Sequence, residues 1–65
     1  MGRRVRALRL QHALTQAELA DRAGISRTTL IVLEQDSRTA RPATVRKLAR
    51  ALGVQPMRLT IGIDA

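Results

Sequence analysis

The sequence predicts a single all-helical domain of four to five short helices. Three observations indicate this fold class. Apolar residues recur every three or four positions in successive segments, which is the spacing of a buried helix face. Residues that favour helix ends flank these segments: Thr15 and Ser26 are N-cap residues, and Gly24 and Gly53 follow the C-terminal ends of helices. A chain of 65 residues has room for one core, so we expect one domain over residues 1–65.

The core must be built from aliphatic side chains, because the chain contains no Phe, Trp, Tyr or Cys. Without cysteine there is no disulfide and no thiolate metal site, and the single His12 cannot hold a metal alone. We therefore expect no metal and no cofactor. The few acidic residues have no spacing suited to acid-base or nucleophilic catalysis, so we do not expect an enzyme.

The net charge of +7, a pI near 11.9 and eleven arginines among the twelve cations are typical of a nucleic-acid-binding domain. Charge alone also fits a solvated surface, a membrane surface or an acidic partner. Single-stranded nucleic acids are usually stacked on aromatic rings, which are absent here, so duplex DNA is favoured. The basic N-terminus is not followed by a signal-peptide core or a membrane span. We expect a cytoplasmic, nucleoid-associated protein.

The first two helices are predicted over residues 3–12 and from about residue 16 to 23. In the first, valine and leucine form a narrow apolar stripe among arginines. The second starts with the pattern of a capping box, in which Thr15 is the N-cap and Glu18 follows three residues later. Gly24 predicts a left-handed turn at its end.

The third helix is predicted over residues 27–34, with Ser26 as its N-cap. Leu30 and Leu33 share the inner face of this helix. The side chains left on the outside are those of Arg27, Thr28, Ile31 and Val32. Exposed apolar residues on a helix need an explanation, which for Ile31 is either partial burial against a neighbouring residue or an interface with another molecule.

The segment from Gln35 to Pro42 lacks periodicity and is predicted as a loop, and a fourth helix is predicted over residues 43–52. The tail at about residues 55–65 has two interpretations. Pro56 can open a one-turn fifth helix, whereas Leu59, Ile61 and Ile63 alternate with polar or small residues as in a strand. A lone strand needs a partner, and the simplest partner is the same strand of a second copy.

The two helices on either side of Gly24 form a helix-turn-helix over about residues 16–34. The segments LTQAELA (14–20), GISRTTL (24–30), LE (33–34) and LARALGV (48–54) resemble the phage repressor and Cro (XRE-like) family of bacterial transcriptional regulators. The resemblance covers about residues 3–59 and implies a compact lambda-repressor-like DNA-binding domain. Its motifs are specific, because several small and capping residues agree at fixed spacing.

The resemblance also implies roles for individual residues. The positions that the family points at base edges in the major groove are Arg27, Thr28 and Val32. An arginine fork can bind guanine O6 and N7, and threonine or valine can contact a thymine methyl. The positions that contact phosphates and fix the protein on the duplex are Gln16, Ser26, Gln35, Arg38 and Arg41.

Arg9 and Glu34 match family positions that form a largely buried ion pair, and we interpret them as structural. The chain departs from the family pattern at Ala13 and Asp36, where the family usually has glycine at left-handed bends. Aspartate tolerates the left-handed conformation moderately and alanine poorly.

These observations predict a homodimeric repressor that reads a near-palindromic operator in double-stranded DNA. The predicted dimerisation residues are Met57, Leu59, Ile61 and Ile63. An alternative is a DNA-binding antitoxin that represses its own operon and binds a toxin protein, because a helix-turn-helix that ends in a Leu-x-Ile-x-Ile strand resembles antitoxins that dimerise through such a strand. A third is a protein-protein adaptor that uses Ile31 and Val32 and has no DNA affinity.

Overall fold

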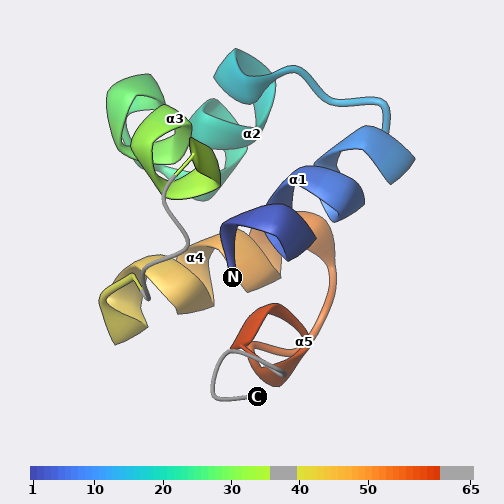
Figure 1. The fold of residues 1–65 in the computed structure, drawn as a ribbon, viewed down its shortest axis with the longest axis vertical. Helices are drawn as coiled ribbons and strands as arrows, with labels where there is room; N and C mark the ends of the chain where they lie inside the picture. Colours follow the sequence, from blue (N-terminus) through green and yellow to red (C-terminus); the bar gives the residue numbers. More distant parts are fainter. Residues whose placement is uncertain (36–39, 61–65) are drawn as a thin grey trace.

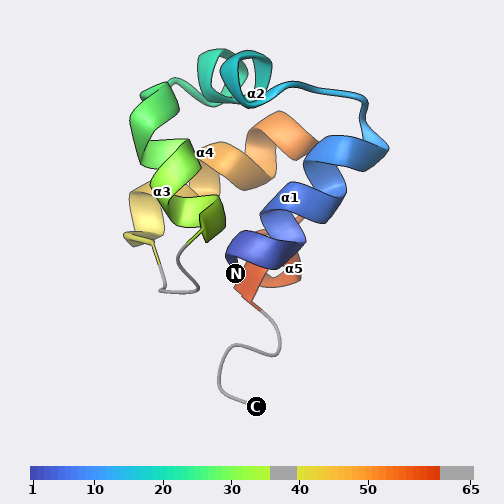
Figure 2. The same ribbon diagram turned by 45° about the horizontal axis from the view of Figure 1, so that its top comes forward.

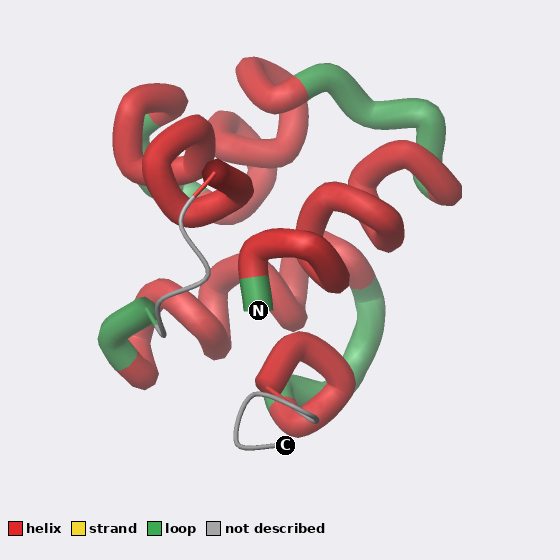
Figure 3. The backbone as a smooth tube through the Cα atoms, viewed as in Figure 1, coloured by secondary structure: helices red, strands yellow, loops and turns green. Residues whose placement is uncertain are grey.

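The computed structural model describes residues 1–35 and 40–60, and it shows five α-helices packed around one core (Figure 1). The helices are α1 (Gly2–Gln11), α2 (Gln16–Ala23), α3 (Arg27–Gln35), α4 (Pro42–Leu52) and α5 (Met57–Thr60). The described residues form helices and connecting loops and contain no strand (Figure 3). The predicted all-α fold class is therefore confirmed.

The hairpin of α2 and α3 rests on the remaining helices. In Figure 2, α2 lies across the top, while α1 and α3 descend on either side and α4 runs between them. The packing follows this layout, since α4 lies mainly against α2 and α1 mainly against α3. The short α5 packs beneath α1 and α4. This scaffold holds α3 at the outside of the molecule.

The core is aliphatic, as the composition requires, and every helix contributes to it. The largest fully buried side chains are Val5, Leu19, Leu30, Leu48, Leu52 and Leu59. Burying one such side chain stabilises the fold by about 1.5–3 kcal/mol relative to leaving it in water. Because these six residues come from all five helices, each helix is stabilised by packing against the others.

The predicted capping box of α2 is present. The Thr15 hydroxyl accepts a hydrogen bond from the Glu18 amide at 3.0 Å, and the Glu18 carboxylate accepts one from the Thr15 amide at 2.9 Å. The amide of Thr15 is the main reason that the pKa of Glu18 lies below its ordinary value. The charged form is favoured in the folded state, so this stabilisation is present at neutral pH and is lost as acid protonates Glu18.

Left-handed glycines end α2 and α4, as the sequence predicts. Gly24 has φ 70° and Gly53 has φ 68°, and each amide returns a hydrogen bond to the preceding helix. Side chains other than glycine's are disfavoured at such angles. Gly24 thereby sets the turn between α2 and α3.

Gly2 brings the first turn of α1 against the backbone of α3. A Cβ atom at this position would overlap the carbonyl oxygen of Leu33 and lie 3.1 Å from the Glu34 Cα atom. Both obstacles are backbone atoms, which cannot rotate away. The two helices therefore approach here at a distance that only glycine permits.

The ends of three helices differ by one residue from the prediction, and α1 runs over Gly2–Gln11 instead of residues 3–12. Gln35 was expected in a loop but is the last residue of α3, and Pro42 was expected to precede α4 but is its first residue. Proline suits the first turn of a helix because its missing N–H has no helical partner there. The predicted irregular segment is consequently shorter at both ends, and Arg38 and Asp36 within it lie outside the described residues.

The strand interpretation of the tail is wrong where the structure describes it. Residues 57–60 form α5, directly after Pro56, so the fifth-helix interpretation is confirmed. Leu59 is fully buried in the chain's own core, instead of lying on a surface open to a partner strand. Burial of this leucine outweighs the local alternation, for which the described residues offer no strand to pair with. Ile61 and Ile63 lie outside the described residues.

Ala13 adopts a left-handed conformation with φ 54°, in the turn between α1 and α2. We expect Ala13→Gly to stabilise the protein. An alanine in this region costs about 1–2 kcal/mol, while the greater flexibility of glycine in the unfolded chain offsets about 0.4–1 kcal/mol. The net gain of about 0.5–1 kcal/mol should raise the melting temperature by about 3–6 °C.

Thermal unfolding followed by circular dichroism measures this change. Ala17→Gly is the matched control, since Ala17 is exposed within α2 and glycine should cost about 1 kcal/mol there. A lower melting temperature for Ala13→Gly would contradict the strain assigned to Ala13.

Candidate nucleic-acid interface

The outer face of α3 carries the side chains predicted to read bases. Arg27, Thr28 and Val32 are all exposed, and 54% of Val32 is accessible to solvent. Thr28, Val32 and Gln35 are spaced by four and three residues, so they follow one face of the helix. The opposite face packs into the core through Leu30. The structure thus brings the predicted base-reading residues together on one open surface.

Ser26 fixes the first turn of α3. Its hydroxyl oxygen accepts a hydrogen bond from the Thr29 amide at 3.0 Å, and the hydroxyl donates to Thr29 Oγ1 at 2.7 Å. The capping role expected of Ser26 is confirmed. Because its hydroxyl hydrogen is used inside the chain, a phosphate contact from this side chain would require the hydroxyl to rotate.

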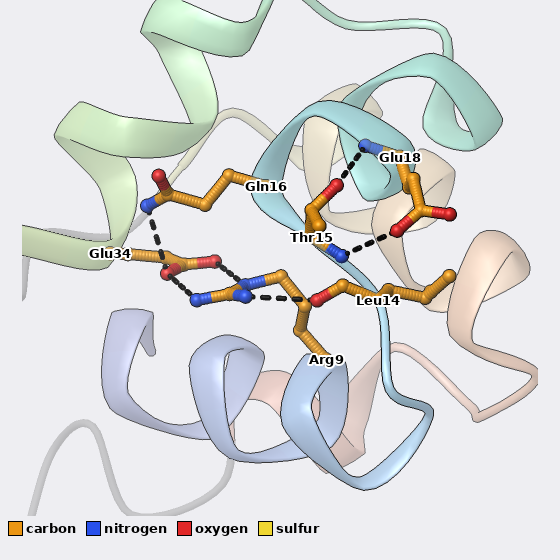
Figure 4. Close-up of polar contacts among 6 residues, drawn as sticks. All are labelled: Arg9, Leu14, Thr15, Gln16, Glu18 and Glu34. Carbon is orange, nitrogen blue, oxygen red and sulfur yellow. Dashed lines mark hydrogen bonds and ion pairs between the residues drawn. The ribbon is translucent and has the colours of Figure 1, made fainter.

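The ion pair expected between Arg9 and Glu34 joins α1 to the end of α3 (Figure 4). Arg9 Nε lies 2.8 Å from Glu34 Oε2, and Arg9 Nη2 lies 3.0 Å from Glu34 Oε1. Arg9 Nη1 also donates to the carbonyl oxygen of Leu14 at 2.9 Å. The exposed fractions of the two charged side chains are only 10% and 3%. One arginine therefore holds α1, the turn after it and α3.

Gln16, which was predicted to contact a phosphate, takes part in the same network. Its Nε2 atom donates to Glu34 Oε1 at 3.2 Å (Figure 4). Glu34 thus accepts hydrogen bonds from both Arg9 and Gln16. The hydrogen bond to Glu34 is the main reason that the pKa of Arg9 is raised.

An open cavity of about 320 Å³ lies beside this network, and its lining residues are Arg6, Arg9, Gln16, Glu34 and Gln35. They come from α1, from the first residue of α2 and from the last turn of α3. Sequence reasoning did not single out Arg6. The available signal was its spacing of three residues from Arg9, which places both side chains on neighbouring parts of one helix surface.

The other predicted site residues are more dispersed. Arg41 is exposed at the N-cap of α4, and Gln35 is exposed at the end of α3. Met57 is 59% exposed on α5, away from the buried Leu59. Arg38, Ile61 and Ile63 lie outside the described residues.

The charge is distributed unevenly along the chain. Residues 40–60 include five cations and no acidic residue, and α1 includes four arginines and no acidic residue. Among the residues that the structure describes, no cluster of three His, Cys, Asp or Glu side chains is placed to hold a metal ion. None of the five described helices is long and apolar enough to cross a membrane.

Comparison with known proteins links this geometry to a family. The model of the family described as "Helix-turn-helix" matches residues 5–59. The immunity repressor protein of Bacillus phage phi105 is 38% identical over 55 residues, which cover 85% of this chain and 38% of that protein. An uncharacterized HTH-type transcriptional regulator of Methanothermobacter thermautotrophicus is 41% identical over 49 residues, covering 75% of this chain and 71% of that protein.

A solved structure is similar over nearly the whole domain. The restriction-modification controller protein C.AhdI from Aeromonas hydrophila superposes with a TM-score of 0.84 and 34% sequence identity. The match covers 89% of this chain and 88% of that one.

Proposed function

The chain belongs to the helix-turn-helix family of phage repressor and Cro type, and from this premise we propose that it is a dimeric, sequence-specific repressor of transcription. As a family member it is a DNA-binding transcriptional regulator whose partner is double-stranded DNA. Sequence similarity to a phage immunity repressor supports repression of transcription over activation. The chain spans 38% of the length of that relative, so the rest of the phage protein has no counterpart in this match.

The exposed face of α3 carries this proposal. Arg27, Thr28 and Val32 lie together on a helix whose opposite face is buried, so α3 can enter the major groove without disturbing the core. In this role Arg27 binds a guanine edge, and Thr28 or Val32 contacts a thymine methyl. A contact with a thymine methyl also explains why the apolar side chain of Val32 is exposed to solvent in the free protein.

The phosphate contacts in this proposal come from Gln16, Ser26, Gln35, Arg38 and Arg41. The positions of Gln16 and Gln35 support it, because they stand at the start of α2 and the end of α3 and line the same cavity. Arg41 stands at the start of α4, beyond the segment that follows α3. These residues fix the position of the domain on the duplex without reading sequence.

A two-fold dimer completes the proposal. Its two recognition helices would enter successive major grooves about 34 Å apart, so the operator would be a near-palindrome. The exposed Met57 on α5, together with Ile61 and Ile63, is the proposed dimerisation surface, with Leu59 supporting it from the core. The antitoxin alternative depended on a strand at Leu59, and with Met57–Thr60 in α5 no described feature favours a toxin partner.

Selection of bound duplexes from a random library at physiological salt tests the function. We expect enrichment of a near-palindromic site with half-sites one helical turn apart. With several phosphate contacts per half-site, affinity for that site should fall by roughly 10³ or more between 50 and 200 mM salt.

A single-stranded pool treated in the same way is the control, and it should yield no enriched motif. Enrichment of no duplex, or a shallow dependence on salt, would contradict the proposal. The adaptor hypothesis, in which Ile31 and Val32 bind a protein, would then be preferred.

A further inference from the structure

We propose that the cavity between α1, α2 and α3 binds a DNA backbone phosphate, with Arg6 as its cationic ligand. The inference rests on the proposed function, because it adds a contact to the same complex. The sequence predicts a phosphate contact for each of Gln16 and Gln35, which lie far apart in the chain. The structure places both in the wall of one cavity together with Arg6.

The charges of the lining residues favour an anion. Among the described residues, Glu34 is the single acidic residue in the wall, and its carboxylate is paired with Arg9 through two hydrogen bonds. Within residues 1–35 and 40–60, Arg6 forms no salt bridge. The described part of the wall therefore carries a net charge of +1, which resides on the exposed Arg6.

The hydrogen-bond donors of the wall also fit a phosphate. The planar guanidinium of Arg6 offers two parallel N–H groups that match a pair of phosphate oxygens. Each amide nitrogen of glutamine has two hydrogens, and Gln16 uses one of them on Glu34. The second hydrogen of Gln16 and the amide of Gln35 remain as donors to the same group.

The cavity lies where a flanking phosphate would be expected. Thr28, Val32 and Gln35 follow one face of α3, and Gln35 is both the last residue of that face and part of the cavity wall. A duplex whose bases meet the start of this face would present its backbone toward the end of it. Arg6 then contacts the duplex from α1, outside the helix-turn-helix itself.

Arg6→Ala tests the inference, with Arg4→Ala as the matched control. Arg4 is also an exposed arginine on α1, but it does not line the cavity. The substitution Arg4→Ala therefore removes the same charge without changing the cavity wall. Binding of each variant to the duplex selected by the wild-type protein is measured over a series of salt concentrations. We expect Arg6→Ala to lose about tenfold in affinity per half-site, which corresponds to one charge-assisted contact.

The slope of log affinity against log salt should decrease by about 1 per half-site for Arg6→Ala. Its order of preference among duplexes should not change, because a phosphate contact carries no sequence information. Arg4→Ala should retain most of the affinity. Arg6→Lys keeps the charge without the fork and should lie between Arg6→Ala and the wild type.

Circular dichroism tests whether the variants are folded. If Arg6→Ala has a lowered melting temperature, Arg6→Lys provides the comparison. Equal losses in Arg4→Ala and Arg6→Ala would overturn the site in favour of general attraction by charge. No loss for Arg6→Ala, or a changed base preference, would also overturn it. If the wild-type protein binds no duplex at all, the proposed function fails and this inference fails with it.

Discussion

Replacing Glu34 by alanine is expected to destabilise the protein by about 3 kcal/mol, because the substitution leaves the Arg9 guanidinium buried without its partner. Only 10% of the Arg9 side chain is exposed in the folded protein, and Glu34 supplies two of its three hydrogen-bond acceptors. A domain of this size is usually stable by about 3–5 kcal/mol. Most of the stability should therefore be lost.

Thermal and urea unfolding measure the effect. A loss of this size should lower the melting temperature by about 12–24 °C. Asp21→Ala is the matched control, since it removes an exposed acidic side chain from α2 and should change the melting temperature little. The doubly substituted Arg9→Leu, Glu34→Leu protein should be more stable than Glu34→Ala, because no charge is then stranded. A Glu34→Ala protein that melts like the wild type would show that the pair is not structural.

Replacing Arg27 by alanine is expected to lower affinity for the operator by about 1–3 kcal/mol per half-site and to relax the base preference. The reason is the loss of a bidentate contact to guanine from the first turn of α3. Arg27 is exposed and shows no role in the core, so the fold should be unaffected. Because the proposed operator has two half-sites, the effect on the dimer should be about twice as large.

Arg41→Ala separates base reading from phosphate contact. It removes the same charge from the start of α4 and should weaken binding to all duplexes alike. Competition between the selected operator and random DNA measures the difference. If both variants lose affinity equally on specific and random DNA, Arg27 does not read a base.

The features that the sequence predicts correctly are those set by neighbouring residues. The capping box of Thr15 and Glu18, the Ser26 cap and the left-handed Gly24 each depend on contacts within about four residues. The spacing of apolar residues along each helix likewise marks the buried face. The ion pair of Arg9 and Glu34 joins residues 25 positions apart, and it was expected only because the family has it.

The features that the sequence left undecided or did not predict depend on distant parts of the chain. The alternation after Pro56 favours a strand locally, and only the burial of Leu59 against the other helices decides for α5. The close approach of Gly2 to Leu33 and the hydrogen bond from Gln16 to Glu34 have no local signal. The cavity with Arg6 could not be expected before the positions of α1 and α3 were known.

The attachment of α3 at both ends has a consequence for the energetics of recognition. Its first turn is fixed by Ser26, and its last turn is held by the Arg9–Glu34 pair and by the close contact at Gly2. A nine-residue helix in water would otherwise sample many conformations, and binding would have to suppress them. Here the helix is preorganised before it meets DNA. More of the energy of each base contact is then available as affinity, since ordering a mobile segment on binding would consume part of it.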